Sequence, residues 1–141
     1  MLTIDASVWV NADSPHEPAS AASRAFLDRV AAAQTRIIVP TLLRVEVAGA
    51  ISRVRKDAPL ALEYSERLSA LPFVRWIALD DSMAARAAAL AAAHGLRGAD
   101  AVYAAVALAH DCELISLDHE HLTRLATVLR VRTPSQQFAA P

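Results

Sequence analysis

The sequence predicts a three-layer α/β fold in which helices cover both faces of a mainly parallel, five-stranded sheet. Short runs of aliphatic residues alternate with segments of helical periodicity along the whole chain. The runs show no polar–apolar alternation, which is typical of strands buried on both faces. Helical segments separate consecutive strands, as the crossover connections of a parallel sheet require.

The composition favours a single domain, residues 1–141, with a substantial core and a loose tail from about Pro134. Apolar residues make up 55% of the chain and the mean hydropathy is +0.29. The longest apolar runs, 84–93 and 101–109, are nevertheless far shorter than the ~20 residues of a membrane span. Without a visible signal peptide, and with Cys112 as the single cysteine, we expect a cytoplasmic protein that does not bind membranes.

The formal net charge of −1 does not by itself indicate a nucleic-acid-binding protein. Lys56 is the only lysine among fourteen basic residues, and the others are arginines, which favour bidentate contacts with phosphate. Arginine also keeps an alanine-rich chain soluble, so charge alone adds only slight support for a nucleic-acid substrate.

The first 40 residues predict two strands and one helix. The apolar run 2–4 forms a strand that stops abruptly at Asp5. Residues 14–17, Ser-Pro-His-Glu, have the cap, the first-turn proline and the acidic residue of a helix start, and helical spacing follows them. A second buried strand, 37–39, is closed by Pro40.

The middle of the chain predicts two helices and a third strand. Thr41 can cap a helix that runs to about residue 56, where Asp57-Ala58-Pro59 breaks it. Residues 60–71 have one apolar helical stripe, and Pro72 separates them from a strand at 74–79.

The last third predicts three helices and two strands. Asp80, Asp81 or Ser82 caps an alanine-rich helix that ends near His94, with Gly95 as a left-handed terminator. The remaining elements are a helix at 98–110, a strand at 113–117, a short helix at 119–126 and a strand at 128–132.

Four acidic residues, Asp5, Glu46, Asp100 and Asp118, are candidates for a functional site. Asp5 and Asp118 end the first and fourth strands, and Asp100 opens a helix, so each has the alternative role of a turn or helix cap. Glu46 is different, because its helical neighbours Leu42, Leu43, Gly49 and Ala50 place it on an apolar, core-facing stripe. A buried carboxylate there needs an arginine, a hydrogen-bond network or a metal as partner.

Carboxylates at the carboxyl ends of parallel strands are expected to converge on one cleft. Two unit charges ~4 Å apart repel by about 4 kcal/mol at an effective dielectric near 20, so a hard divalent cation would stabilise the cluster. All-oxygen ligands select Mg²⁺ or Mn²⁺, and such a site suits metal-assisted phosphodiester hydrolysis.

Other polar residues give weaker support for a functional site. His119 and His121 diverge on a helix, so a solvated first turn explains them better than a zinc site does. Cys112 is expected to fill the core. Ser7 can contact Asp5 or a phosphate, or can be an ordinary turn serine.

These motifs resemble the PIN domain, specifically the VapC-like ribonuclease toxins of bacterial toxin–antitoxin modules. The resemblance spans nearly the whole chain and is strongest around Asp100. Ser116 stands where the family often has threonine, and no acidic position is missing. The matching segments are Asp5-Ala6-Ser7, Pro40-Thr41 with Glu46, Leu96 to Ala105, and Leu114 to Asp118.

The resemblance implies a sheet of order 3-2-1-4-5, Mg²⁺-dependent cleavage of single-stranded RNA, a homodimer and a cognate antitoxin. In the mechanism that we expect, Asp5, Glu46 and Asp100 hold Mg²⁺, and Asp118 orients water or completes a second metal site. Ser7 and Ser116 support the cluster by hydrogen bonds, and Arg97 contacts phosphate. The alternatives are a non-catalytic partner-binding domain and a metal-dependent phosphatase.

Overall fold

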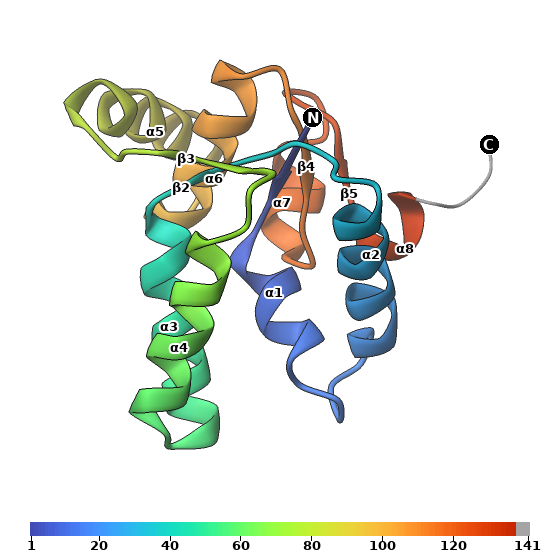
Figure 1. Cartoon of the computed structure of the whole chain (residues 1–141). Helices are drawn as coiled ribbons and strands as arrows, with labels where there is room; N and C mark the ends of the chain where they lie inside the picture. Colours follow the sequence, from blue (N-terminus) through green and yellow to red (C-terminus); the bar gives the residue numbers. More distant parts are fainter. Residues whose placement is uncertain (138–141) are drawn as a thin grey trace.

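The computed structural model describes residues 1–137 and confirms the α/β fold (Figure 1). Its strands pair in parallel in the order β3-β2-β1-β4-β5, as the resemblance implied. The central strand β1 therefore lies between β2 and β4, where the strand order reverses. In this part of the chain the strands are β1 (Leu2–Ile4), β2 (Ile37–Pro40), β3 (Val74–Ile77), β4 (Glu113–Ile115) and β5 (Val131–Arg132).

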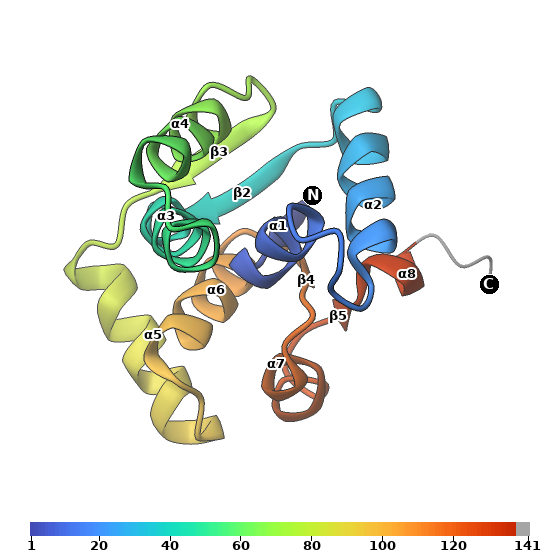
Figure 2. The same ribbon diagram turned by 90° about the horizontal axis from the view of Figure 1, so that it is seen from below.

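Helices cover both faces of the sheet. Figure 2 shows α2 and α8 on one side and α5 and α6 on the other. The central helix α6 packs on β1, β2 and β4, and its residues 101–107, mostly alanine and valine, are all buried. The helices are α1 (Ala6–Ala12), α2 (Ser20–Ala32), α3 (Leu42–Arg55), α4 (Ala58–Ser69), α5 (Asp81–His94), α6 (Gly98–Ala109), α7 (His119–Arg124) and α8 (Pro134–Gln137).

The register between β1 and β4 decides which side chains meet at the carboxyl edge of the sheet. Thr3 pairs with Leu114 and Ile4 with Ile115, so the next residues along the two strands lie side by side. The Asp5 amide continues the ladder by donating to the Ile115 carbonyl at 2.9 Å. Ile4 and Ile115 are fully buried, so the last pair of this ladder lies in the core directly below the carboxyl edge.

The predicted helix start at Ser14 is wrong. Asp5 instead caps α1, and the Ser14 hydroxyl donates to the Val10 carbonyl at the end of that helix. The next helix begins only at Ser20, after Ala19 takes a left-handed conformation with φ 66°. Val8, Trp9 and Ala12 on α1 are buried, so tertiary packing stabilises a helix too short to be recognised from periodicity.

Other boundaries differ by a few residues. The helix expected at 60–71 begins at Ala58, because the Asp57 carboxylate caps it by accepting from the Leu60 amide. The tail expected to be loose from Pro134 forms α8, in which Pro134 is buried, and its last residues, 138–141, lie outside the described residues. The Asp80 cap and the left-handed Gly95 terminator of α5 are confirmed.

None of the helices within residues 1–137 combines the length and the apolar character that crossing a membrane would require.

Candidate active site

Asp5 lies at the junction of β1 and α1, and its buried carboxylate is held by hydroxyl and amide donors. Its Oδ2 accepts from the Ser7 amide at 3.2 Å and also from the Ser7 hydroxyl. The Ser116 hydroxyl reaches the same oxygen from β4, at 3.2 Å. Asp5 is thus both a helix cap and a member of the cluster, so the two roles weighed from the sequence are compatible.

Ser7 and Ser116 connect the ends of the two central strands. Ser7 Oγ accepts from the Leu117 amide at 3.1 Å, and Ser116 Oγ accepts from the Asp118 amide at 2.9 Å. Each hydroxyl therefore links Asp5 to the backbone that follows β4. The Ser7 and Ser116 side chains thus both support the Asp5 carboxylate. Their part in a metal site stays a prediction.

Glu46 on α3 has a tyrosine as its partner. The Tyr103 hydroxyl, on α6, donates to Glu46 Oε2 at 2.6 Å. The buried stripe of α3 is Leu43, Val47 and Ile51, so Glu46 lies at its edge and is half-buried instead of facing the core as expected. Burial raises the pKa of Glu46 against the lowering effect of the Tyr103 hydrogen bond, and the charges of Asp5 and Asp100 raise it further.

Asp100 is the third residue of α6, not the N-cap that the sequence suggested, since Arg97 occupies the capping position. Its carboxylate is almost buried and accepts from Arg97 Nε at 2.8 Å. Burial raises the pKa of Asp100, and the Arg97 hydrogen bond opposes that rise without cancelling it. The carboxylate that begins α6 therefore points into the cluster.

Asp118 caps α7 and faces the cluster at the same time. Oδ1 accepts from the Glu120 amide at 2.7 Å, and Oδ2 lies 2.5 Å from Arg97 Nη2. Burial acts to raise the pKa of Asp118, but the Glu120 amide and the Arg97 charge outweigh it and leave the pKa lowered.

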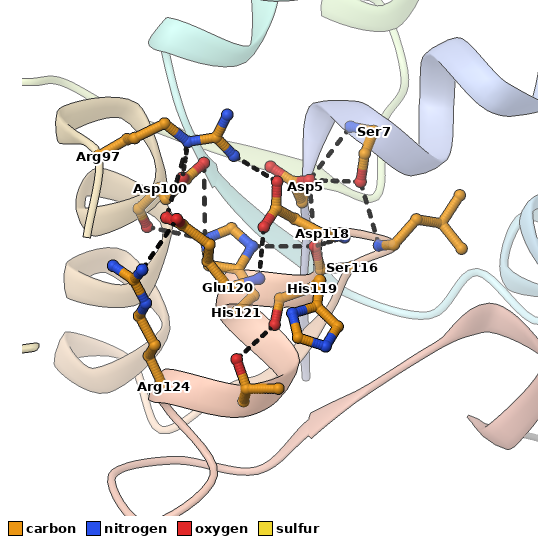
Figure 3. Close-up of polar contacts among 12 residues, drawn as sticks. Asp5, Ser7, Arg97, Asp100, Ser116, Asp118, His119, Glu120, His121 and Arg124 are labelled. Carbon is orange, nitrogen blue, oxygen red and sulfur yellow. Dashed lines mark hydrogen bonds and ion pairs between the residues drawn. The ribbon is translucent and has the colours of Figure 1, made fainter. Parts of the chain in front are cut away.

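The four carboxylates form one electrostatic cluster at the carboxyl edge of the sheet. Asp5 and Asp100 each raise the pKa of Glu46, and Asp118 raises that of Asp100. Figure 3 shows Asp5, Asp100 and Asp118 gathered beside the Arg97 side chain. The expected convergence is thus present, although the first cation beside these carboxylates is a guanidinium of the protein itself.

Residues 2–128 match the family model of the PIN domain, which covers nearly all of the chain. The chain belongs to the PIN domain family. No curated protein sequence matches it.

Solved structures similar to this PIN domain include toxin–antitoxin proteins. A toxin–antitoxin complex from Klebsiella pneumoniae is 19% identical with a TM-score of 0.68, over 95% of this chain and 98% of that one. FitAcB from Neisseria gonorrhoeae is 21% identical with a TM-score of 0.69, over 95% and 98%. VapC20 from Mycobacterium tuberculosis, a sarcin–ricin loop cleaving toxin, is 13% identical with a TM-score of 0.72, over 92% and 96%. At these identities the likeness establishes the fold.

Two further polar residues, His121 and Tyr103, lie beside the carboxylates, and neither position was expected from the sequence. His121 was expected in a solvated first turn, and this is wrong: its side chain is fully buried and hydrogen-bonded. Leu125, one turn further along the chain, is also fully buried. In the sequence, the i, i+4 spacing of His121 and Leu125 could have indicated that both lie on the buried face of the helix. Tyr103 lies in the apolar run of α6, where nothing local marks it as the partner of Glu46.

The donor set fits a hard divalent cation by its chemistry, because it consists of carboxylate oxygens. Arg97 shows that the cluster attracts positive charge, since its guanidinium contacts Asp100 and Asp118 and lies 3.7 Å from Glu120 Oε2. Among residues 1–137, however, no three His, Cys, Asp or Glu side chains are grouped as metal ligands. A metal ion at Asp100 and Asp118 would therefore have to displace Arg97.

Proposed function

We propose that this PIN domain is a Mg²⁺-dependent endoribonuclease that cleaves single-stranded regions of RNA and acts as the toxin of a toxin–antitoxin module. The observation that carries the proposal is the cluster of Asp5, Glu46, Asp100 and Asp118, which come from four separate elements. Burial and neighbouring carboxylates raise the pKa of Glu46 and of Asp100, so a cation beside these two groups would favour their ionised forms. The VapC and FitAB folds support a nuclease of the toxin class.

In this proposal Asp5, Glu46 and Asp100 hold Mg²⁺, for which Mn²⁺ can substitute, and Asp118 orients water or completes a second cation site. A bound cation would supply Lewis-acid activation of water and neutralise charge on the phosphodiester. Ser7 and Ser116 keep Asp5 in position through their hydroxyl groups. Arg97, once released from Asp100 and Asp118, is placed to contact a phosphate group of the RNA.

The partners that we propose are a cognate antitoxin and a second copy of the chain. The similar folds include toxin–antitoxin complexes, which supports an antitoxin. Helices α3 and α4 also expose aliphatic side chains that a partner could cover, among them Val45 at 69% and Leu62 at 61% exposure. Cytoplasmic localisation belongs to the same proposal.

RNA cleavage by the purified chain tests the function. Single-stranded RNA should be cleaved with Mg²⁺ and not with EDTA. Asp5→Asn and Asp100→Asn should each lose roughly 100-fold or more in rate, the scale of removing one positioned charge from an active site. Asp28→Asn, at an exposed position of α2, is the matched control and should cleave like the wild type. Undiminished cleavage by either cluster variant would remove the proposed mechanism.

The same preparation separates the nuclease from a phosphatase. A small phosphate monoester offered alongside RNA should be turned over far more slowly, because the proposed site is built for a phosphodiester within a chain. Faster turnover of the monoester would favour the phosphatase.

A non-catalytic, partner-binding domain is the second candidate, and one observation favours it. Arg97 already neutralises Asp100 and Asp118, so half of the cluster has a partner without a metal. This candidate predicts no RNA turnover in Mg²⁺ or Mn²⁺, with wild type and Asp5→Asn equally inactive and equally able to bind the partner.

A further inference from the structure

His121 is a fully buried polar residue of α7 for which the proposed chemistry so far has no use. A polar side chain in such a place needs hydrogen-bond partners for its donor and its acceptor. Both ring nitrogens have one: Nδ1 lies 2.9 Å from Ser116 Oγ, and Nε2 lies 3.0 Å from the Asp100 backbone oxygen. The ring therefore bridges the start of α6 and the end of β4 (Figure 3).

The partners determine which nitrogen carries the proton. A carbonyl oxygen can only accept, so Nε2 of His121 donates to Asp100. In the neutral ring, Nδ1 is then an acceptor, and the Ser116 hydroxyl donates to it. The ring thus donates a hydrogen bond to the Asp100 carbonyl on α6 and accepts one from the Ser116 hydroxyl, which follows β4.

The link also affects Asp5 through the single proton of Ser116. That hydroxyl has two acceptors within reach, His121 Nδ1 at 2.9 Å and Asp5 Oδ2 at 3.2 Å. His121 Nδ1 and Asp5 Oδ2 thus share one donor, and the imidazole fixes the orientation of the hydroxyl that lies between them. Without the imidazole, the hydroxyl would lose the partner that orients it beside Asp5.

Packing alone does not require a histidine here. Leu125, one turn further along at the end of the helix, is fully buried as an aliphatic side chain, so burial at this face does not by itself require a polar residue. What the imidazole adds is the pair of hydrogen bonds. Both end on groups that adjoin candidate metal ligands, the Asp100 backbone and the hydroxyl that contacts Asp5.

We propose that His121 is a positioning residue of the site, which fixes the first turn of α6 relative to β4 and so holds the Asp100 and Asp5 carboxylates in place for a divalent cation. Only the part of this inference that concerns metal binding rests on the proposed function. The structural role of the His121 bridge does not depend on it. Second-layer hydrogen bonds of this kind change metal affinity by about 10- to 100-fold when removed.

The test compares His121→Phe with His119→Phe, an exposed position two residues earlier on the same helix. Calorimetry with Mn²⁺ should show affinity about 10- to 100-fold weaker for His121→Phe and unchanged for His119→Phe. Urea unfolding of the metal-free proteins should show a lower midpoint for His121→Phe, because two buried hydrogen bonds are lost, so calorimetry is run where both variants are fully folded. Equal affinity of wild type and His121→Phe overturns the proposal, as does an equal loss in both variants.

Two conservative variants separate the two hydrogen bonds. The amide of glutamine reaches the place of Nε2 and can still donate to the Asp100 carbonyl, whereas asparagine reaches only the place of Nδ1. His121→Gln should therefore recover more Mn²⁺ affinity than His121→Asn, because the Asp100 backbone is the group adjoining a ligand. Mn²⁺ affinity that is as weak in His121→Gln as in His121→Phe would count against a positioning role for the hydrogen bond to the Asp100 carbonyl.

Hydrogen exchange of the metal-free protein distinguishes failure of this inference from failure of the nuclease proposal. The Ala101 amide, bonded to the Arg97 carbonyl, and the Asp118 amide, bonded to Ser116 Oγ, lie on either side of the bridge. Both should exchange faster in His121→Phe and not in His119→Phe. A wild type that binds no Mn²⁺ overturns the metal site, while unchanged exchange at both amides overturns the role of His121.

Discussion

Nη2 of Arg97 lies 2.5 Å from Oδ2 of Asp118, and this ion pair joins the start of α6 to the start of α7. The same guanidinium contacts Asp100 through Nε at 2.8 Å. The two carboxylates stabilise the charged guanidinium, and hydrogen bonding to Asp100 is the largest cause of the raised pKa of Arg97. Arg97 and a divalent cation are therefore competitors for the same oxygens.

Arg97→Gln should bind Mn²⁺ or Mg²⁺ more tightly than the wild type, by roughly two- to fivefold, the range of exposed ion pairs. The reason is that the cation no longer has to displace a guanidinium. Titration calorimetry measures the change. Arg124→Gln is the control, because Arg124 pairs with Glu120 and does not contact Asp100 or Asp118. Weaker binding by Arg97→Gln would show that the arginine assists the cation instead of competing with it.

Glu46→Gln should stabilise the metal-free protein at pH 7, by about 1 kcal/mol, as removal of an unfavourable functional charge often does. Burial raises the pKa of Glu46 above its ordinary value of 4.5, so the folded state holds this proton more tightly than the unfolded state. Its contribution to stability therefore falls as the pH rises from below 4.5 through the raised pKa.

The difference between wild type and Glu46→Gln should accordingly be small near pH ~4 and largest at neutral pH. Urea unfolding at a series of pH values, without divalent metal, measures it. A difference that shrinks as the pH rises would mean that the ionised carboxylate is stabilised in the fold, contrary to the burial of Glu46.

Tyr103→Phe should fold and lose about 1 kcal/mol of unfolding free energy, the typical net value of one hydrogen bond. Tyr103 is fully buried and its hydroxyl donates to Glu46, which lowers the pKa of that carboxyl. Loss of the donor should raise the pKa of Glu46 further, which carboxyl ¹³C chemical shifts can follow. An unchanged titration of Glu46 would show that the contact does not persist in solution.

Ser116→Ala should lose about 1–3 kcal/mol, the cost of leaving buried polar groups without a partner. The fully buried hydroxyl accepts from the Asp118 amide and lies within reach of Asp5 and His121. Ser116→Thr keeps the hydroxyl and should retain most of the stability. Denaturant unfolding of both variants measures the change. Equal losses of unfolding free energy in the two variants would assign the effect to packing and not to the hydroxyl.

Local signals were sufficient for most of the fold. The runs that became β1 and β2, the Asp80 cap and the Gly95 terminator of α5 follow from hydrophobicity and backbone preference, which act within a few residues. The helix α1 was missed because its seven residues are too few for a periodic pattern, and its stability comes from burying Val8 and Trp9.

The sequence by itself determined the parallel α/β framework and the place of Asp5 directly after β1, because strand and helix preferences depend on neighbouring residues. Asp118, expected at the end of the fourth strand, instead lies beyond the end of β4 at Ile115 and caps α7. Tertiary structure alone decided the partners: Tyr103 for Glu46, Arg97 for Asp118, and His121 between α6 and β4. These contacts join side chains from elements distant in the chain, so they depend on how α3, α6 and α7 dock at the edge of the sheet. No periodicity within one segment encodes that docking.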